Sequence, residues 1–348
     1  MTTTAKPASA VVNRIGLSRA DYNGASSTLC NGCGHNSIAN VIVGAAYDLS
    51  LDPTRIAKFS GIGCSSKSLA YFLGRSHSIN GLHGRMPSLA TGASIVNKEL
   101  VAIGVSGDGD TGSIGFGQFK HLLRRNVDMV YIIENNGVYG LTKGQLSSTA
   151  DLGQRSKHGG SNEMPPTDLC LEAIISGCGF VARSFAGDPR QLQTLLKAAF
   201  SHRGTALVNI ISPCVTFNNG EASSKSYAWG REHQLPLHEI SFLPLEHDEI
   251  QVDYEPGTVR EVALHDGSIL RLKKTDLEYD PTDRMAAITL LEEERAGQLF
   301  TTGLLYLDGG RQTLVEHEKL VDLPLVRLPN EKLRPSQEAL DKINAEYL

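Results

Sequence analysis

Short apolar runs alternate with amphipathic runs through the first 240 residues of the chain. Apolar positions at helical spacing predict helices over about 36–48, 87–99, 114–125, 168–176 and 189–201. The short apolar runs between them predict strands over 56–59, 101–105, 129–133, 180–183 and 206–211. Because strands alternate with helices, we expect an α/β fold, a parallel sheet with helices on both faces. Ligands of such sheets bind at the carboxyl ends of the strands, which directs attention to the loops that follow them.

The pattern changes after about residue 240. Residues 251–275 alternate in the manner of strands around His265-Asp266-Gly267, which predicts a β-hairpin. A charged amphipathic helix is predicted over about 282–296, and the tail from Pro329 is polar. We therefore expect two parts, a main domain over 1–240 and a C-terminal α+β extension over 241–348.

Composition and charge exclude several classes of function. The 348 residues carry a formal net charge of -5, without the clustered basic excess that binds nucleic acid or acidic membranes. No run of about 18 or more apolar residues is present, so no membrane span is predicted. The N-terminal stretch lacks the apolar segment of a secretory signal, and six cysteines in a chain this long do not indicate a disulfide framework. We expect a reducing, cytoplasmic setting in which the thiols are free to bind metal.

Four cysteines occur in glycine- or proline-containing turns. Cys30 and Cys33 form a C-x2-C pair, Cys64 follows Gly61-Ile62-Gly63, and Cys214 follows Pro213. Four soft sulfur ligands suit either zinc or an iron–sulfur cluster. A second close pair, which zinc sites usually have, is absent, and this mildly favours a cluster. Cys170 and Cys178 lie in apolar stretches and are assigned to the core.

A second pattern begins at Gly107-Asp108-Gly109 and closes at Asn135-Asn136, a span of 30 residues. Each end follows a predicted strand. A carboxylate from one loop and an amide oxygen from the next are hard ligands for the divalent cation of a diphosphate, and glycine amides favour the phosphates. Either end alone favours an ordinary turn, but the two together at strand ends indicate a cation-and-diphosphate site.

This spacing is similar to the thiamine diphosphate-binding motif. The chain also resembles the beta subunit of 2-oxoacid:ferredoxin oxidoreductases in the runs CNGCGH, GIGCSSK, LHGR, SGDGDTGSIGFGQFKHLLRRNVD and NNGVYGLTKGQ. The resemblance extends through most of residues 28–240. The stretches YDPTDRMAA and TTGLLYLD resemble the 2-oxoglutarate-type members.

The resemblance implies particular ligands and contacts. It implies one [4Fe–4S] cluster on Cys30, Cys33, Cys64 and Cys214, and Mg²⁺ on Asp108, Asn136 and the carbonyl of Val138. It implies that thiamine diphosphate is lined by Ile62, Gly63, Cys64, Ser65, His83, Gly109, Asp110, Leu141 and Thr142.

Lys67 and Lys143 occupy positions where the family contacts substrate, although a solvated surface cation is an equally good interpretation of either. His83 is also compatible with an ordinary surface turn, which is the weaker interpretation. For His35, we favour a helix-start residue over a catalytic base.

By the same resemblance, the chain is one subunit of an enzyme. The enzyme decarboxylates a 2-oxoacid oxidatively with coenzyme A, releases CO₂ and passes electrons through the cluster to ferredoxin, or it runs the reverse carboxylation. The two lysines and the C-terminal stretches favour 2-oxoglutarate over pyruvate or other 2-oxoacids. No glutamate of a pyrimidine-activating motif is evident, so a separate alpha subunit is expected in an α₂β₂ assembly, without which this chain is catalytically incomplete.

Two other interpretations stay open at this point. One is a non-redox thiamine decarboxylase whose cysteines hold structural zinc, and the other is a zinc-stabilised interaction subunit without turnover. The chain also departs from the family pattern at Asn31, where Pro is frequent, and at Ser147-Ser148-Thr149, where Ser-Pro-Thr is frequent. Neither departure removes a ligand, so only local loop geometry is affected.

Overall fold

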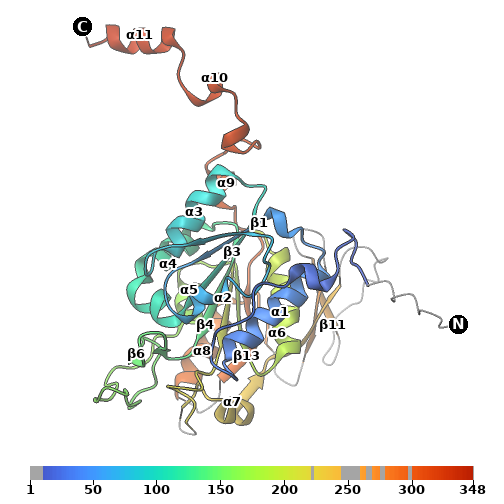
Figure 1. Ribbon diagram of the computed structural model, residues 1–348, viewed down its shortest axis with the longest axis vertical. Helices are drawn as coiled ribbons and strands as arrows, with labels where there is room; N and C mark the ends of the chain where they lie inside the picture. The colour runs from blue at the N-terminus through green and yellow to red at the C-terminus, as the bar shows by residue number, and fades with distance from the viewer. Residues whose placement is uncertain are drawn as a thin grey trace, which may run out of the picture.

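A mostly parallel, eight-stranded sheet forms the centre of the molecule (Figure 1). The computed structural model describes residues 11–220, 223–243, 259–263, 269–274, 279–296 and 300–347. The strand order is β2-β1-β3-β4-β8-β7-β13-β9. These strands are β1 (Ile56–Ser60), β2 (His77–Asn80), β3 (Val101–Gly107), β4 (Met129–Asn135), β7 (Phe180–Phe185), β8 (Thr205–Ile211), β9 (Gln234–Pro236) and β13 (Phe300–Leu307). All neighbours are parallel except β13 and β7.

Two smaller sheets and a set of helices complete the described residues. The small sheets contain β5 (Val138–Tyr139) with β6 (Gln145–Leu146), and β10 (His238–Leu243) with β12 (Ile269–Lys274) and β11 (Val259–Ala263). The α-helices are α1 (Gly34–Asp48), α2 (Cys64–Ser68), α3 (Met86–Val96), α4 (Phe116–Arg125), α5 (Leu169–Ile175), α6 (Pro189–Ser201), α7 (Tyr227–His233), α8 (Arg284–Ala296), α9 (Leu314–His317), α10 (Asn330–Leu333) and α11 (Gln337–Ala345). Short 3-10 turns cover Arg19–Tyr22, Pro53–Arg55 and Leu325–Arg327, and a π turn covers Asp110–Ile114.

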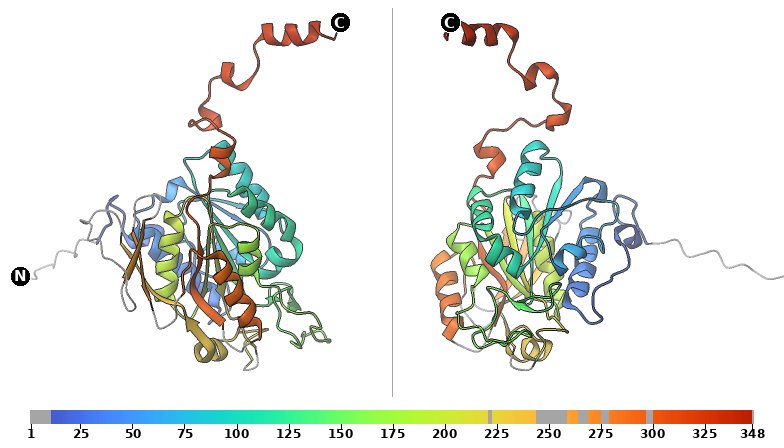
Figure 2. Two further views of the ribbon diagram at one scale, coloured as in Figure 1. Left: turned by 180° about the vertical axis from the view of Figure 1, so that it is seen from behind. Right: turned by 60° about the vertical axis from the view of Figure 1, so that its left-hand side comes forward.

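Helices cover both faces of the main sheet (Figures 1 and 2). The alternation of side chains along β4 sends Val130 and Ile132 to one hydrophobic cluster, with α1 and α6, and Tyr131 and Ile133 to another, with α3, α4, α5 and α8. Both faces of β4 are therefore buried. The predicted fold class, a parallel sheet with helices on both faces, is confirmed.

Most predicted elements are present, with shifts at their ends. The helix predicted over 189–201 is α6, and the strand predicted over 206–211 is β8 with one more residue. The helix predicted from residue 114 begins later, at Phe116, because the π turn over Asp110–Ile114 precedes it. The predicted hairpin pairs β11 with β12, with Ala263 opposite Ile269. Its predicted turn, His265-Asp266-Gly267, lies outside the described residues.

The C-terminal part contributes to the main sheet. The strand β13 pairs with β7 and extends the sheet that the first 240 residues build. The division of the chain at residue 240 stays a prediction. Beyond α9, the segment with α10 and α11 extends away from the body of the molecule (Figure 1). Within the described ranges, no helix combines the length and apolar character needed to cross a membrane.

A buried ion-pair triad joins β7 to two helices. Arg183 on β7 is 4% exposed, and its guanidinium lies 2.5 Å from Asp168 and 2.6 Å from Glu294 of α8. Asp168 also accepts hydrogen bonds from the amides of Cys170 and Leu171 at the start of α5. The triad therefore fixes α5 and α8 against the sheet.

Arg183→Met should destabilise the fold strongly because it leaves two carboxylates buried without their cation. We expect the free energy of unfolding to fall by about 3–5 kcal/mol, measured by urea denaturation. The control is Arg327→Met, which removes a pair with Glu99 in which the arginine side chain is 62% exposed. That loss should be below about 1 kcal/mol, and equal losses in the two variants would contradict the role of the triad.

Candidate functional site

A cleft opens at the carboxyl ends of β1, β3 and β4. Most of its lining residues come from the segments that follow β1, β2, β3 and β4, and the others belong to α1, β3 and β4: His35, Ile62, Gly63, Cys64, Ser65, His83, Gly107, Asp108, Gly109, Asp110, Glu134, Asn136, Val138, Tyr139, Gly140, Leu141 and Thr142. Every residue predicted to line thiamine diphosphate is among them, as are the three predicted Mg²⁺ ligands. The structure thus brings these residues together, while their roles stay predictions.

Asp108 lies at the floor of the cleft. It directly follows β3, whose Gly107 pairs in register with Glu134 of β4. Asp108 is 1% exposed, and its Oδ1 accepts a hydrogen bond of 3.2 Å from the backbone amide of Asn136. This register brings Asp108 and Asn136 side by side, the two residues predicted to supply a carboxylate and a side-chain amide oxygen to Mg²⁺. A carboxylate, an amide oxygen and the carbonyl of Val138 form a hard oxygen set that suits Mg²⁺.

Asp110 joins two loops of the cleft. Nδ1 of His83 lies 2.5 Å from its Oδ1, which also accepts the amide of Gly84 at 2.9 Å. Its Oδ2 accepts the hydroxyl of Ser106 at 2.9 Å. A Cβ at Gly61 would lie 2.0 Å from the same Oδ2. The glycine after β1 is therefore needed for this close approach, and Asp110 holds His83 at the rim.

Gly109 is required for a different reason. A Cβ at this position would lie 2.5 Å from the ring of Tyr139, whose hydroxyl donates to the Gly109 carbonyl at 2.9 Å. The loop that contains Gly109, directly after β3, is thus packed against the loop that follows β4. Any side chain at Gly109 would push the two loops apart.

Cys64 and Cys214 both lie close to Gly140. A Cβ added there would lie 3.4 Å from Sγ of Cys64 and 3.7 Å from Sγ of Cys214. Cys64 begins α2, and its thiol is half-buried, as is that of Cys214. A residue without a side chain therefore leaves the space between these two thiols open.

The Cys30–Cys33 turn packs against the loop of Cys214. The amide of Gly34 donates to the carbonyl of Pro213 at 3.2 Å, and the hydroxyl of Thr216 lies 3.5 Å from Sγ of Cys30. Four sulfurs from three loops thus gather beside the cleft, a donor set that fits an iron–sulfur cluster. Within the described ranges, no three His, Cys, Asp or Glu side chains are placed to hold a single metal ion.

Burial keeps two of these thiols, those of Cys33 and Cys64, protonated without metal. It raises the pKa of Cys33 to about 12 and that of Cys64 to about 11, and the neighbouring thiols add to both shifts. The other two cysteines, Cys170 and Cys178, are fully buried in the core, as predicted.

A buried polar pair forms the inner wall of the cleft. Oε2 of Glu134 accepts a hydrogen bond from the hydroxyl of Ser68 at 3.0 Å and lies 3.5 Å from Nε2 of His35. Its Oε1 has no hydrogen-bond partner within the described part of the chain. Burial raises the pKa of Glu134 well above its ordinary value and lowers that of His35 to about 4. The pair is therefore uncharged rather than an ion pair, and Nδ1 of His35 contacts Ser212 at 2.6 Å.

Lys67 and Lys143 lie at the margin. Lys67 is half-buried on α2, and Lys143 is exposed with a positive φ of 80°. Neither is among the described residues that line the cleft. Their contact with substrate stays a prediction.

Sequence reasoning missed three polar residues of this site. Glu134 is an acidic residue inside the fully buried strand β4, and this contrast was a usable signal. Ser147 and Thr149 were noted only for their loop geometry, and no signal linked them to Asp108, because their hydroxyls reach it from outside the motif.

Comparison with known proteins defines the class first. Residues 61–210 match the family described as the thiamine pyrophosphate enzyme, C-terminal TPP binding domain. This segment begins directly after β1 and contains β3, β4 and almost all of β8, with the loops that build the cleft. The fold and the cleft therefore define a domain of the thiamine pyrophosphate enzymes.

Relatives that match more than half of the chain define the family. The chain is 39% identical over 210 residues to the 2-oxoacid:ferredoxin oxidoreductase subunit beta of Saccharolobus solfataricus, covering 59% of this chain and 67% of that one. It is 42% identical over 194 residues to the Sulfolobus subunit beta (55% and 63%), and 40% identical over 195 residues to the 2-oxoglutarate oxidoreductase subunit KorB of Mycobacterium tuberculosis (55% and 51%). The chain thus spans about half to two thirds of the length of these relatives. It belongs to the family of 2-oxoacid:ferredoxin oxidoreductase beta subunits.

A solved structure agrees with this assignment. The 2-oxoglutarate:ferredoxin oxidoreductase from Magnetococcus marinus, with 2-oxoglutarate, coenzyme A and succinyl-CoA bound, is similar over 91% of this chain and 94% of that chain. The TM-score is 0.71 and the identity is 30%. The likeness extends well beyond the segment that the family description covers.

Glu134→Gln should change how stability depends on pH. A raised pKa in the folded state means that the protonated carboxyl stabilises the fold below pH 4.5, and this stability is lost as pH rises toward the folded-state pKa. Glutamine has no proton to lose. The variant should therefore gain stability relative to the unchanged chain as pH rises from 5 to 8, by at most about 1.4 kcal/mol per pH unit. Urea denaturation across this range measures the difference, and parallel curves would contradict the raised pKa.

Proposed function

We propose that this chain is the thiamine diphosphate- and cluster-binding subunit of a 2-oxoacid:ferredoxin oxidoreductase, with 2-oxoglutarate as the 2-oxoacid. The reaction converts the 2-oxoacid and coenzyme A to an acyl-CoA and CO₂, with two electrons passed singly to ferredoxin, or runs in reverse. A separate alpha subunit completes the active site in an α₂β₂ assembly.

One observation carries the proposal. The segment Ile62–Ser65 lines the cleft, and within it Cys64 lies with Cys214 close to Gly140. A diphosphate cleft and a four-thiol set therefore share a segment of chain. A non-redox decarboxylase has no use for this proximity, whereas an enzyme that removes electrons from a substrate-derived carbanion requires it.

Residues of this chain would hold the Mg²⁺ ion and the iron–sulfur cluster. Asp108, Asn136 and the Val138 carbonyl would hold Mg²⁺, and Cys30, Cys33, Cys64 and Cys214 would hold the [4Fe–4S] cluster. When bound, thiamine diphosphate supplies an electron sink for the carbanion left by decarboxylation, and the cluster supplies a one-electron acceptor.

Protein groups around the cleft orient and enclose the substrate. Asp110 holds His83 at the rim, where its ring can contact a bound ligand. The uncharged wall of Glu134 and His35 keeps charge away from the inner cleft.

The choice of 2-oxoglutarate rests on charge and on relatives. Lys67 and Lys143 lie close in sequence to residues that line the cleft. They would meet the distal carboxylate that distinguishes 2-oxoglutarate from pyruvate. The Magnetococcus marinus enzyme is described with 2-oxoglutarate bound, and the Mycobacterium tuberculosis relative is named for the same 2-oxoacid.

Anaerobically purified protein should be brown, with broad visible absorbance and bound iron and sulfide. Cys214→Ser should lose most of this absorbance and iron because it removes one cluster ligand. Cys178→Ser is the matched control, because that thiol is buried in the core and donates to the Phe180 and Thr205 carbonyls, as a hydroxyl also can. A colourless preparation that contains zinc would overturn the cluster assignment.

Substrate choice is tested with the complex of this chain and its alpha subunit. Turnover should be faster with 2-oxoglutarate than with pyruvate. Lys67→Met and Lys143→Met should each raise the KM for 2-oxoglutarate by about 10- to 100-fold, the effect of a lost charged hydrogen bond, and leave the KM for pyruvate unchanged. Lys332→Met on α10 is the control, and a preference for pyruvate in the unchanged complex would defeat the substrate proposal.

A further inference from the structure

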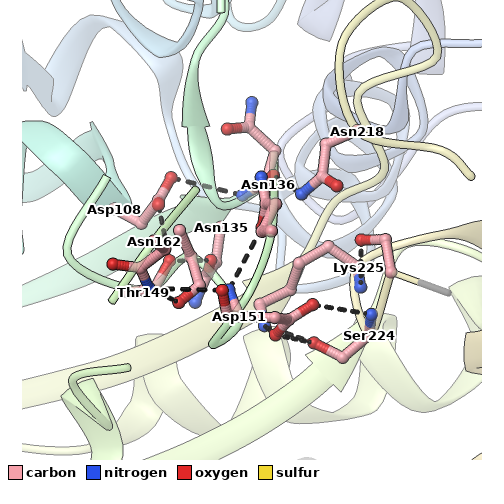
Figure 3. A network of polar contacts seen from close by, with 12 residues as sticks. Asp108, Asn135, Asn136, Thr149, Asp151, Asn162, Asn218, Ser224 and Lys225 are labelled. Atoms are coloured by element: carbon pink, nitrogen blue, oxygen red, sulfur yellow. Dashed lines mark hydrogen bonds and ion pairs between the residues drawn. The ribbon is translucent and has the colours of Figure 1, made fainter. Parts of the chain in front are cut away.

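Two hydroxyl groups from outside the diphosphate motif converge on its carboxylate, and Figure 3 shows one of them, Thr149, beside Asp108. Thr149 Oγ1 donates to Oδ2 of Asp108 at 2.6 Å, and the hydroxyl of Ser147 donates to the same oxygen. The amide of Asn136 donates to Oδ1 at 3.2 Å. Three donors from two separate segments thus fix the orientation of one side chain.

We propose that Ser147 and Thr149 are positioning residues that set the Mg²⁺ affinity of the Asp108 site. This inference rests on the proposed function, since it takes Asp108 as a Mg²⁺ ligand. Ser147 and Thr149 lie outside the motif from Gly107 to Asn136, so the proposed Mg²⁺ site would also depend on residues beyond that motif.

Burial makes these contacts strong. Asp108 is 1% exposed, Thr149 2% and Ser147 7%, so water does not compete for the carboxylate. A buried carboxylate needs hydrogen-bond donors, and bonds to a charged acceptor are stronger than those between neutral groups. With Oδ2 held from one side, the remaining lone pairs of the carboxylate point in a defined direction.

Thr149 has a second contact that restrains it. Its Oγ1 lies 2.8 Å from Oδ1 of Asn135, the last residue of β4. A hydroxyl carries one proton and donates to one acceptor at a time, and the charged carboxylate of Asp108 is the stronger acceptor. Thr149 therefore lies between the ends of β3 and β4, the two strands that carry the motif.

The segment that carries the hydroxyls is itself anchored. The amide of Ser147 donates to the carbonyl of Gly137 at 3.3 Å. Two residues beyond Thr149, Asp151 accepts the amide of Ser224 at 2.9 Å and contacts Nζ of Lys225 at 3.0 Å. Figure 3 shows this chain of contacts from Asp108 to Lys225. The hydroxyls are thus presented from a braced segment, as positioning groups for a metal ligand must be.

The test measures Mg²⁺ binding directly. The full complex, stripped of divalent cations and saturated with thiamine diphosphate, is titrated with Mg²⁺ in an anaerobic calorimeter. Thr149→Val keeps the shape and removes the hydroxyl, so the Kd for Mg²⁺ should rise about 10- to 100-fold, the usual effect of losing a partner of a metal ligand. Thr149→Ser restores the hydroxyl and should stay within about threefold of the unchanged complex.

Ser147→Ala is a second variant, which keeps the proposal testable if Thr149→Val does not fold. Ser148→Ala is the matched control, because Ser148 lies between the two positioning residues and its buried hydroxyl has no hydrogen-bond partner among the residues that the structure describes. Folding of each variant is checked by thermal denaturation.

The outcomes separate this inference from the proposed function. A raised Kd in Thr149→Val and Ser147→Ala, with Ser148→Ala unchanged and kcat regained at high Mg²⁺, supports positioning. An unchanged Kd in folded Thr149→Val or Ser147→Ala overturns it. If the unchanged complex binds no Mg²⁺ with thiamine diphosphate, the proposed function fails instead.

Discussion

The parallel register between β3 and β4 is the constraint on which the site depends. With Gly107 opposite Glu134, the residues that follow the two strands emerge side by side, and Asp108 meets the amide of Asn136. The two strands are buried on both faces, so the packing of the whole sheet maintains this register. A slip of one residue would exchange the faces of every side chain on β4 and separate the carboxylate from the amide.

The two candidate cofactor sites are coupled through short stretches of chain. Cys64 belongs both to the cleft and to the thiol set. A second connection runs through Asn218. Its side-chain amide donates a hydrogen bond to the carbonyl of Asn136 at 2.8 Å, and its backbone amide donates one to the carbonyl of Cys214. A displacement of either site is therefore transmitted to the other by single hydrogen bonds and covalent connections. Such a geometry suits electron transfer, which depends on a fixed separation.

Local sequence patterns predicted the elements well where burial and periodicity agree. The helix α6 matches its predicted bounds because Pro189 begins it and its apolar positions have helical spacing. The late start of α4 was not predictable, since the π turn before it depends on tertiary contacts such as those of Asp110. The place of β13 beside β7 likewise depends on pairing between residues more than a hundred positions apart, which no local pattern records.

The candidate site was likewise predictable from the sequence only in part. The glycine motifs and the cysteines were visible because each is defined by residue type and spacing. Ser147 and Thr149 were not, because a hydroxyl is an ordinary loop residue until the fold places it against Asp108.

The protonation of the inner site follows from its burial. The thiols of Cys33 and Cys64 hold their protons because burial raises their pKa, and Glu134 holds its proton for the same reason. These two thiols and the Glu134–His35 pair are thus uncharged without bound metal, which avoids adding uncompensated negative charge to that of the buried Asp108. Thiolates are the form that binds metal, so filling the thiol set must release protons. Metal cations at the thiols and Mg²⁺ beside the diphosphate would then supply the positive charge that compensates each anion, and the neutral Glu134–His35 pair avoids adding a further charge between them.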